Sequence, residues 1–320
     1  MNTSTTRLLT GVGLALTLGL GSAQAQQIAF GTMGQGTAGY SMGAAIAGVL
    51  SENGIRARVQ PSAGTSAYLP LMETGELDFG IANIVETSEA LSGTGGFEGH
   101  RHDNVRIASI LFPFRVGMFV PEDSDIETLS DLRGKRVTHG YTTQRTIGRV
   151  VDALLANGGL TSDDIRPVRV PNVVRGADDL AAGRADAGFF AIGAGKVSEV
   201  DASVGGVRFL PVSEDPEAVE RMRAIVPEAY VATVQPRSGM AGIAQPTPSM
   251  AYDYVLLVGA HVPADTVAEV VKILNANKDK LAASFGGFRG WDTNRMFVET
   301  DAPYHEGAEK ALRELGQWKD

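Results

Sequence analysis

The chain has 320 residues, of which 43% are hydrophobic and 20% are charged, and its formal net charge is −9. A chain of this length fits two domains better than one. It has no cysteine, which excludes a disulfide framework and a thiolate metal site. The acidic balance argues against nucleic acid and anionic membranes as partners, although local arginines can still form a site for an anion.

Residues 1–25 are typical of a secretory signal. Arg7 supplies the positive start, residues 8–20 form a 13-residue apolar run, and Ala23-Gln24-Ala25 is a small-x-small cleavage site. The run is too short to span a membrane. Cleavage after Ala25 leaves a 295-residue exported chain, and because the segment carries one Arg and no acid, the charge becomes −10. We therefore expect a periplasmic protein that does not itself span the membrane.

Strands alternate with helices along the first third of the chain, which predicts an α/β fold with a mostly parallel sheet. The first strand precedes the glycine-rich stretch 31–43, which opens a helix over 41–51. Further strands are expected over 55–60 and 77–82, and helices over 66–74 and 85–91. Two separate strands, 105–112 and 116–121, are expected on either side of Pro113-Phe114-Arg115.

The βα pattern starts again after residue 121, which predicts a second block. Strands are expected over 136–138, 166–170, 185–190 and 207–211, and helices over 146–156, 174–182, 194–200 and 216–225. A proline-rich irregular stretch (227–248) precedes an apolar strand (254–260), a helix (266–274) and a C-terminal helix within 302–317. We predict lobe I from residues 26–118 plus 252–320 and lobe II from residues 119–251, with a hinge of crossing strands and a cleft between the lobes.

The glycine-rich stretch allows other interpretations. Gly34-x-Gly36-x-x-Gly39 matches a dinucleotide fingerprint, but the second strand does not end in the acid that would hold a ribose. Ser41 lies in a formal G-x-S-x-G match, although about ten loop residues separate it from the strand, where a nucleophile elbow needs a sharp turn. An exported α/β serine hydrolase using Ser41 remains the alternative from another functional class. We expect no cofactor and no metal.

Three loops, 31–40, 61–65 and 140–146, each follow a strand and open a helix, so they are expected at the carboxyl edge of a sheet, where ligands bind. Helix N-termini present free N–H groups and favour anions. Arg145 begins a helix, an unfavourable place for a cation, which suggests a role in holding a ligand carboxylate. The predicted ligand-binding residues are Gly36, Thr37, Tyr40, Gly64, Thr65, Asn83, Arg115, Tyr141, Thr142, Thr143, Gln144, Arg145 and Phe190.

Several stretches also resemble the TAXI family of solute receptors, which serve TRAP (tripartite ATP-independent periplasmic) transporters. The similarity lies in the opening with Gly31-Thr32, Gly36, Tyr40 and Gly43, and in residues 59–65, 71–81, 129–137 and 305–309. It implies a two-lobed, Venus-flytrap, type II-like binding protein, monomeric and without enzymatic activity. Such a receptor delivers a small organic anion to a membrane permease, and family ligands include glutamate and 2-oxoglutarate.

This chain departs from the family pattern in two loops. The family opening usually has Thr and Tyr where this chain has Ala38 and Gly39, so an aromatic contact carries over only to Tyr40. The loop of the second lobe usually has a small Gly-Ser-Gly segment where this chain has Thr143-Gln144-Arg145. We hypothesise a ligand carboxylate at Arg145, with Arg115 or the first loop holding the other end of a dicarboxylate. A receptor for an ABC-type or tripartite tricarboxylate importer is the closer alternative.

Overall fold

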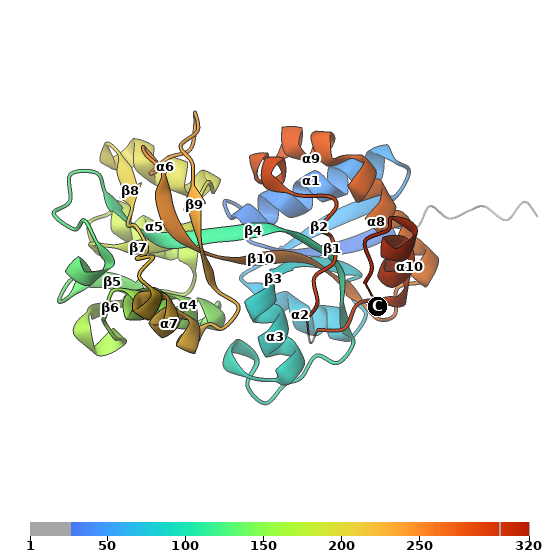
Figure 1. Cartoon of the computed structure of the whole chain (residues 1–320), viewed down its shortest axis with the longest axis horizontal. Coiled ribbons are helices and arrows are strands. Elements are labelled where there is room, and N and C mark those ends of the chain that lie inside the picture. Colours follow the sequence, from blue (N-terminus) through green and yellow to red (C-terminus); the bar gives the residue numbers. More distant parts are fainter. Residues whose placement is uncertain (1–26, 301, 320) are drawn as a thin grey trace, which may run out of the picture.

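The computed structural model describes residues 27–300 and 302–319, so the predicted signal segment lies outside the described residues. The chain folds into two lobes side by side (Figure 1). It passes from the first lobe to the second along β4 (Val105–Pro121) and returns along β10 (Thr247–Gly259). The expected boundaries near residues 118 and 252 both fall inside these two long strands, and the exact division between the lobes stays a prediction.

The first lobe contains both ends of the described chain. Its strands are β1 (Gln27–Met33), β2 (Arg56–Ser62) and β3 (Phe79–Asn83). Its helices are α1 (Ala38–Glu52), α2 (Thr65–Glu73), α3 (Ile84–Ser92), α8 (Ala264–Ala276), α9 (Lys278–Ser284) and α10 (Glu306–Glu314). Short 3-10 turns cover Gly95–Phe97 and Gly286–Gly290.

The second lobe is built from the middle of the chain. Its strands are β5 (Arg136–His139), β6 (Arg166–Arg169), β7 (Gly188–Ala191), β8 (Val207–Phe209) and β9 (Tyr230–Val234). Its helices are α4 (Arg145–Asn157), α5 (Val173–Ala181), α6 (Gly195–Val204) and α7 (Pro216–Ile225), with 3-10 turns at Leu129–Leu132 and Ser162–Asp164.

One sheet of eight strands continues through both lobes in the order β2-β1-β3-β10-β4-β7, with β8 paired to β4 and β9 to β10. The expectation of a mostly parallel sheet is wrong. Among the described strands, only β1 with β2, β1 with β3, and β5 with β6 pair in parallel, whereas β10 and β4 are antiparallel to every strand they pair with. The two crossing strands run in opposite directions because one leaves the first lobe and the other returns to it.

The predicted break at Pro113 is also wrong, because β4 is one continuous strand. The register of β10 against β4 shifts between Asp253 and Val255, opposite Pro113. A bulge at this place accommodates a proline that has no N–H to give to the ladder. The stretch 227–248, predicted to be irregular, contains β9, and α9 was not predicted.

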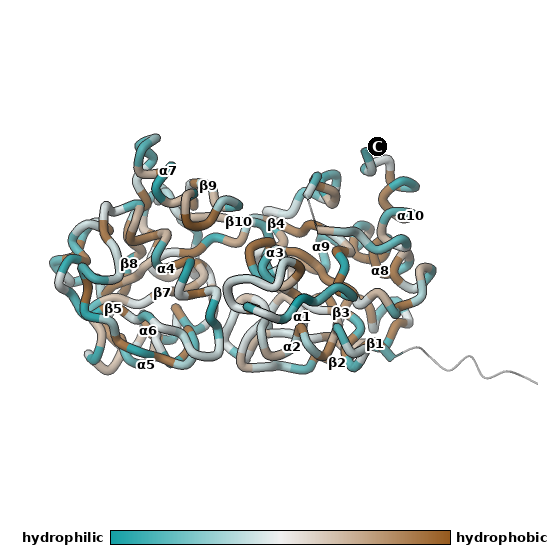
Figure 2. The backbone as a smooth tube through the Cα atoms, turned by 90° about the horizontal axis from the view of Figure 1, so that it is seen from below, coloured by the Kyte–Doolittle hydropathy of each residue, from teal (hydrophilic) through white to brown (hydrophobic). Residues whose placement is uncertain are grey.

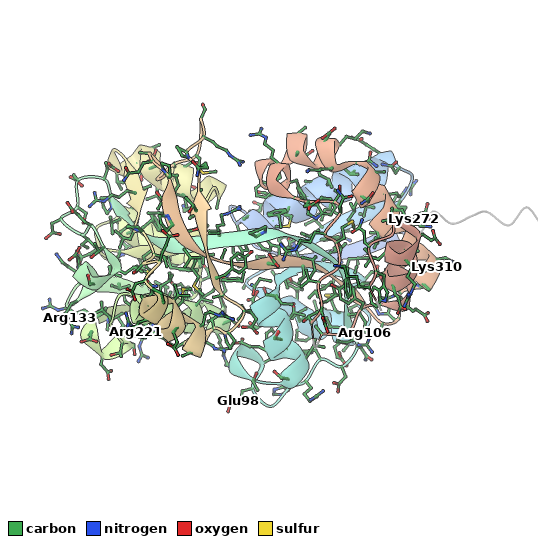
Figure 3. The ribbon with its side chains drawn as sticks, in the orientation of Figure 1. Glu98, Arg106, Arg133, Arg221, Lys272 and Lys310 are labelled. Atoms are coloured by element: carbon green, nitrogen blue, oxygen red, sulfur yellow. The ribbon has the colours of Figure 1, made fainter. Side chains whose placement is uncertain are left out.

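The helices begin where local chemistry favours it. Thr37 caps α1, Asn83 caps α3 and Asp215 caps α7, each by accepting a hydrogen bond from a backbone N–H of the first turn. Apolar segments lie in the interior of both lobes and hydrophilic segments along their outline (Figure 2). Charged side chains such as Arg133, Arg221, Lys272 and Lys310 lie on the outside of the two lobes (Figure 3).

Candidate functional site

A small space lies between the lobes, beside the crossing strands. We call it the inner cavity. Its volume is about 20 Å³, close to that of one water molecule. Both lobes and both crossing strands contribute to its lining, which consists of Met33, Thr37, Ala38, Gly39, Asn83, Glu86, Phe114, Ile147, Val173, Phe190, Ala191 and Tyr254. Most of these groups are apolar, and Glu86 is the only ionisable carboxyl among them.

Glu86 is held at the start of α3 by its own helix cap. Asn83 accepts a hydrogen bond from the Glu86 N–H at 3.0 Å, and its amide donates to Oε2 of Glu86 at 2.5 Å. The Thr65 hydroxyl donates to the same oxygen at 2.9 Å. Burial raises the pKa of Glu86 to about 7, the two hydrogen bonds oppose this rise, and the charge of Glu89 adds to it.

A wider hollow, which we call the arginine pocket, adjoins the inner cavity. Its volume is about 450 Å³, within the range of small-molecule sites. Arg115 on β4, Arg237 after β9 and Arg289 in a 3-10 turn of the first lobe all line it. Aromatic side chains complete the walls, namely Phe112, Phe114, Tyr254 and Phe285.

Arg115 is the half-buried arginine of this pocket. Its Nε is inaccessible to solvent and has no hydrogen-bond partner among the described residues. Burial lowers its pKa, Arg237 acts in the same direction, and Tyr230 and Asp253 oppose the shift. A buried guanidinium nitrogen without a partner is costly, so an anion placed against Nε of Arg115 would relieve that cost.

Within residues 27–300 and 302–319, five polar contacts join the lobes around these hollows. Gln144 Nε2 donates to the Ala63 carbonyl at 3.2 Å, and Ser66 Oγ donates to the Thr143 carbonyl at 3.1 Å. The Lys196 N–H donates to the Gly36 carbonyl at 3.3 Å. The other two contacts are hydrogen bonds that Glu89 accepts from the second lobe. The lobes are therefore in contact along the rim of the crevice.

Glu89 is a buried side chain at that rim and accepts hydrogen bonds from the second lobe. Its side chain is 2% exposed and accepts hydrogen bonds from Thr146 Oγ1 at 2.6 Å and from Arg149 Nη1 at 2.7 Å. Thr146 and Arg149 both lie on α4 of the second lobe, and the Gly96 N–H of the first lobe adds a third bond at 3.1 Å. This cluster ties α3 to α4.

The chain matches the NMT1-like family over residues 30–316, which is most of its length. It belongs to the NMT1-like family. This NMT1-like protein also has the α/β, two-lobed fold of periplasmic binding proteins. A structure of a periplasmic transporter shares 12% identity with it at a TM-score of 0.61, over 92% of this chain and 94% of the other.

Two further solved structures have the same fold. PhnD1 from Prochlorococcus marinus in complex with methylphosphonate has 12% identity and a TM-score of 0.56, over 92% of this chain and 100% of that one. The alkanesulfonate-binding protein SsuA from Xanthomonas axonopodis pv. citri, bound to MOPS, has 17% identity and a TM-score of 0.52, over 91% and 85%.

The structure of the NMT1-like protein brings several predicted site residues to the crevice. Thr37, Asn83 and Phe190 line the inner cavity, and Arg115 lines the arginine pocket. Other predicted residues lie at the rim between the lobes or beside Glu86, namely Gly36, Gly64, Thr65, Thr143 and Gln144.

The remaining predicted residues line neither hollow. Tyr141 is a core side chain whose hydroxyl bonds to Thr138 and whose pKa is raised by burial. The Tyr40 hydroxyl meets the side chain of Gln35 at 3.4 Å. Thr142 and Arg145 are exposed to solvent. Their roles as ligand contacts stay predictions.

Sequence reasoning missed five lining residues that define the two hollows: Glu86, Phe114, Arg237, Tyr254 and Arg289. Glu86 had a signal, because an acid three residues after a capping Asn is typical of a helix start. Arg237 and Arg289 lie in irregular stretches, where no local pattern shows which way a side chain points.

Other features of the NMT1-like protein fit a site less well. A hollow of about 760 Å³ lies at the second lobe alone, and Glu122, Asp123 and Glu127 at its edge disfavour an anion. Ser41 Oγ donates to the Thr37 carbonyl at 3.3 Å, which is a helix-turn bond and not the bond of a nucleophile to a base. Among the described residues, no cluster of three His, Cys, Asp or Glu side chains could hold a metal, and no helix is long and apolar enough to cross a membrane.

Proposed function

We propose that this NMT1-like protein is a periplasmic solute-binding protein that captures a small organic anion between its lobes. The observation that carries this proposal is the arginine pocket. Arg115, Arg237 and Arg289 converge on one hollow between the lobes, and in the described part of the chain none of the three makes an ion pair. Unpaired arginines with aromatic walls suit a ligand with a charged head and an apolar body.

The anionic class has independent support. The neighbours in fold include a protein that binds alkanesulfonates and one that holds methylphosphonate, both of which are organic anions. The resemblance to the TAXI receptors favours a carboxylate, such as an oxo acid, an acidic amino acid or a dicarboxylate. Arg115 is the residue to which we assign the anionic head.

The binding energy fits the site. Micromolar capture needs about −8 kcal/mol. Each hydrogen bond to a charged group contributes about 1.5–3 kcal/mol, so a bidentate contact to Arg115 with partial burial of the ligand body reaches this range. Contacts to both lobes would favour the arrangement in which the rim is closed.

A ligand screen tests the proposal. We expect at least one of 2-oxoglutarate, L-glutamate, pyruvate and methanesulfonate to raise the melting temperature, whereas neutral pyruvamide does not. At 100 times the Kd a ligand adds about 2.7 kcal/mol to stability. Equal shifts with pyruvamide, or no shift with any of the four anions, would contradict anion capture.

We further propose a TRAP-type permease as the partner, on the basis of the TAXI resemblance. The anion should then enter proteoliposomes that hold the permease only when this protein is present, and without ATP. Strictly ATP-dependent uptake would favour an ABC-type importer instead.

A further inference from the structure

One oxygen of the Glu86 carboxyl group has no hydrogen-bond partner in the described part of the chain. The residue is 3% exposed and lines the inner cavity. Oε2 accepts both available hydrogen bonds, from Thr65 at 2.9 Å and from Asn83 at 2.5 Å. Oε1 accepts none from any described residue, although it belongs to a side chain that water barely reaches. A free polar atom in such a place suits a ligand group.

Among the described residues, no cation forms an ion pair with Glu86 or opposes the rise of its pKa. Tyr68 of α2 and the tyrosines Tyr252 and Tyr254 of β10 each have a pKa raised in part by the charge of Glu86. On α3, Glu89 adds a like charge. The cation of the facing helix α4, Arg149, is already bound to Glu89.

The rest of the second-lobe wall gives Glu86 no charge either. Ile147 and Val173 are apolar and line the same cavity. An ionised carboxylate here would be poorly solvated and would also repel an anion held in the adjoining arginine pocket. A neutral carboxyl avoids both penalties and turns the free oxygen into a donor.

We propose that Glu86 is a ligand-contact residue that acts as a neutral carboxyl, donating its proton in a hydrogen bond to the captured anion. Capture then takes up a proton from solvent onto Oε1 whenever Glu86 was ionised beforehand. No covalent bond to the ligand forms or breaks. This inference rests on the proposed function, because it needs an anion in the crevice.

Burial places the titration of this group in an accessible range. The pKa of Glu86 is raised to about 7, first by burial and then by Glu89, against the bonds from Thr65 and Asn83. The free protein therefore holds both forms of Glu86 near neutral pH. If only the neutral form binds, affinity should fall about tenfold between pH 6 and pH 8, with about half a proton taken up per anion at pH 7.

The experiment is calorimetric titration at pH 6, 7 and 8 with the tightest binder among 2-oxoglutarate, L-glutamate, pyruvate and methanesulfonate. The carboxylates and sulfonate of these probes stay ionised over this range. Repeating the titration at pH 7 in two buffers of different ionisation enthalpy measures how many protons the wild-type protein takes up on binding. This measurement needs no substituted protein. Glu86→Gln supplies a permanently neutral group that still accepts the bonds from Thr65 and Asn83.

We expect Glu86→Gln to bind at every pH about as tightly as the wild type does at pH 6. Glu98→Gln, the same change at an exposed position labelled in Figure 3, should keep the wild-type pH dependence. Tenfold weaker binding by Glu86→Gln at pH 6 would show that a neutral hydrogen-bond donor at this position does not support capture, which overturns the proposal.

Other outcomes separate this inference from the proposed function. Tight binding of an anion without proton uptake, or with the same pH dependence in Glu86→Gln, overturns the role of Glu86 and leaves anion capture intact. Failure of the wild type to bind any of the four probes at pH 6 overturns both.

Discussion

The inner cavity and the arginine pocket share walls but differ in charge and room. Ala38, Phe114 and Tyr254 line both. The inner cavity holds one buried acid in about 20 Å³, whereas the arginine pocket holds three arginines around about 450 Å³. The inner cavity is thus an acidic end of the crevice with almost no free space, and the arginine pocket is a cationic end with room for a ligand. This difference would orient a ligand, with its strongest negative charge toward Arg115.

The largest expected effect concerns the acidic end. Because the pKa of Glu86 is raised from 4.5 to about 7, the folded protein binds this proton more tightly than the unfolded chain. Stability should therefore fall as pH rises from about 4.5 through 7, by an amount on the order of 3 kcal/mol. Glu86→Gln removes this loss, so in urea unfolding it should be more stable than the wild type at pH 8.

At pH 5 the two proteins should unfold at similar urea concentrations, because Glu86 is then neutral in the folded wild type. Glu98→Gln serves again as the control and should leave the pH dependence of stability unchanged. Equal stability of Glu86→Gln and wild type at both pH values would mean that ionisation of Glu86 does not destabilise the folded protein.

The next effect concerns the cationic end. Arg115→Met keeps a long apolar stem and removes the charge, so affinity for the anion should fall by about 2 kcal/mol, or roughly thirtyfold. Arg145→Met is the matched substitution at an exposed position and should change affinity little. If calorimetry gave the reverse order, the ligand carboxylate would lie at Arg145, as the sequence alone suggested.

A third substitution changes the rim, where the two lobes are in contact around the inner cavity and the arginine pocket. A Cβ on Gly64 would lie 2.4 Å from the carbonyl oxygen of Thr143 in the other lobe. Gly64→Ala should therefore hinder contact between the lobes and weaken ligand binding by about 1 kcal/mol or more, without a comparable loss of thermal stability. The effect should appear as a larger radius of gyration in X-ray scattering with ligand present.

Gly48→Ala is the control for this change. Gly48 lies within α1, and a Cβ there would meet nothing within 4 Å. Because alanine favours a helix, stability should rise by about 0.5–1 kcal/mol and ligand affinity should stay the same. Normal binding by Gly64→Ala would show that the rim contact is not needed for capture.

The smallest effect is expected at the rim beside the acidic end. Arg149→Met removes the ion pair with buried Glu89, but Arg149 is 36% exposed, so solvent screening reduces the loss to about 1 kcal/mol. Affinity should fall about fivefold, and Arg149→Lys should restore part of it. Unchanged affinity would mean that the α3–α4 contact does not favour the ligand-bound arrangement.

Much of the fold followed from local patterns in the sequence. Gly54, Gly75, Gly93 and Gly205 adopt positive φ at or just beyond helix ends, and periodic apolar residues place the helices between such stops. The two-lobed class is confirmed. Strand direction was not predictable, because the alternation of strands and helices that indicated crossing strands does not reveal that these strands join the main sheet in antiparallel pairs. Nor did Pro113 show that a bulge beside it, where Leu111 and Phe112 of β4 stand opposite Tyr254 of β10, would let β4 continue.

The site was predictable where its chemistry is local. Thr37 was predicted because it lies in a loop that opens a helix, and Asn83 because it is a polar residue just after a strand; both turn out to cap helices that begin at the inner cavity. Arg145 shows the limit of that approach. It begins α4, yet the rotation of this helix is set by burial of Ile147, Val150 and Leu154, which leaves Arg145 exposed. Arg237 and Arg289 reach the pocket only through tertiary packing.

The crossing strands line part of the arginine pocket, which is the proposed ligand site. Phe114 and Arg115 lie on β4 and Tyr254 lies on β10, so these contacts belong to the segments that join the lobes. If the lobes rotate about β4 and β10, groups near this axis travel a short arc, whereas the outer ends of the lobes travel a long one. A displacement of a fraction of an ångström at Arg115 would therefore correspond to a larger displacement at the surfaces farthest from the crevice. A small movement in the arginine pocket would thus be amplified at the outer surfaces of the protein.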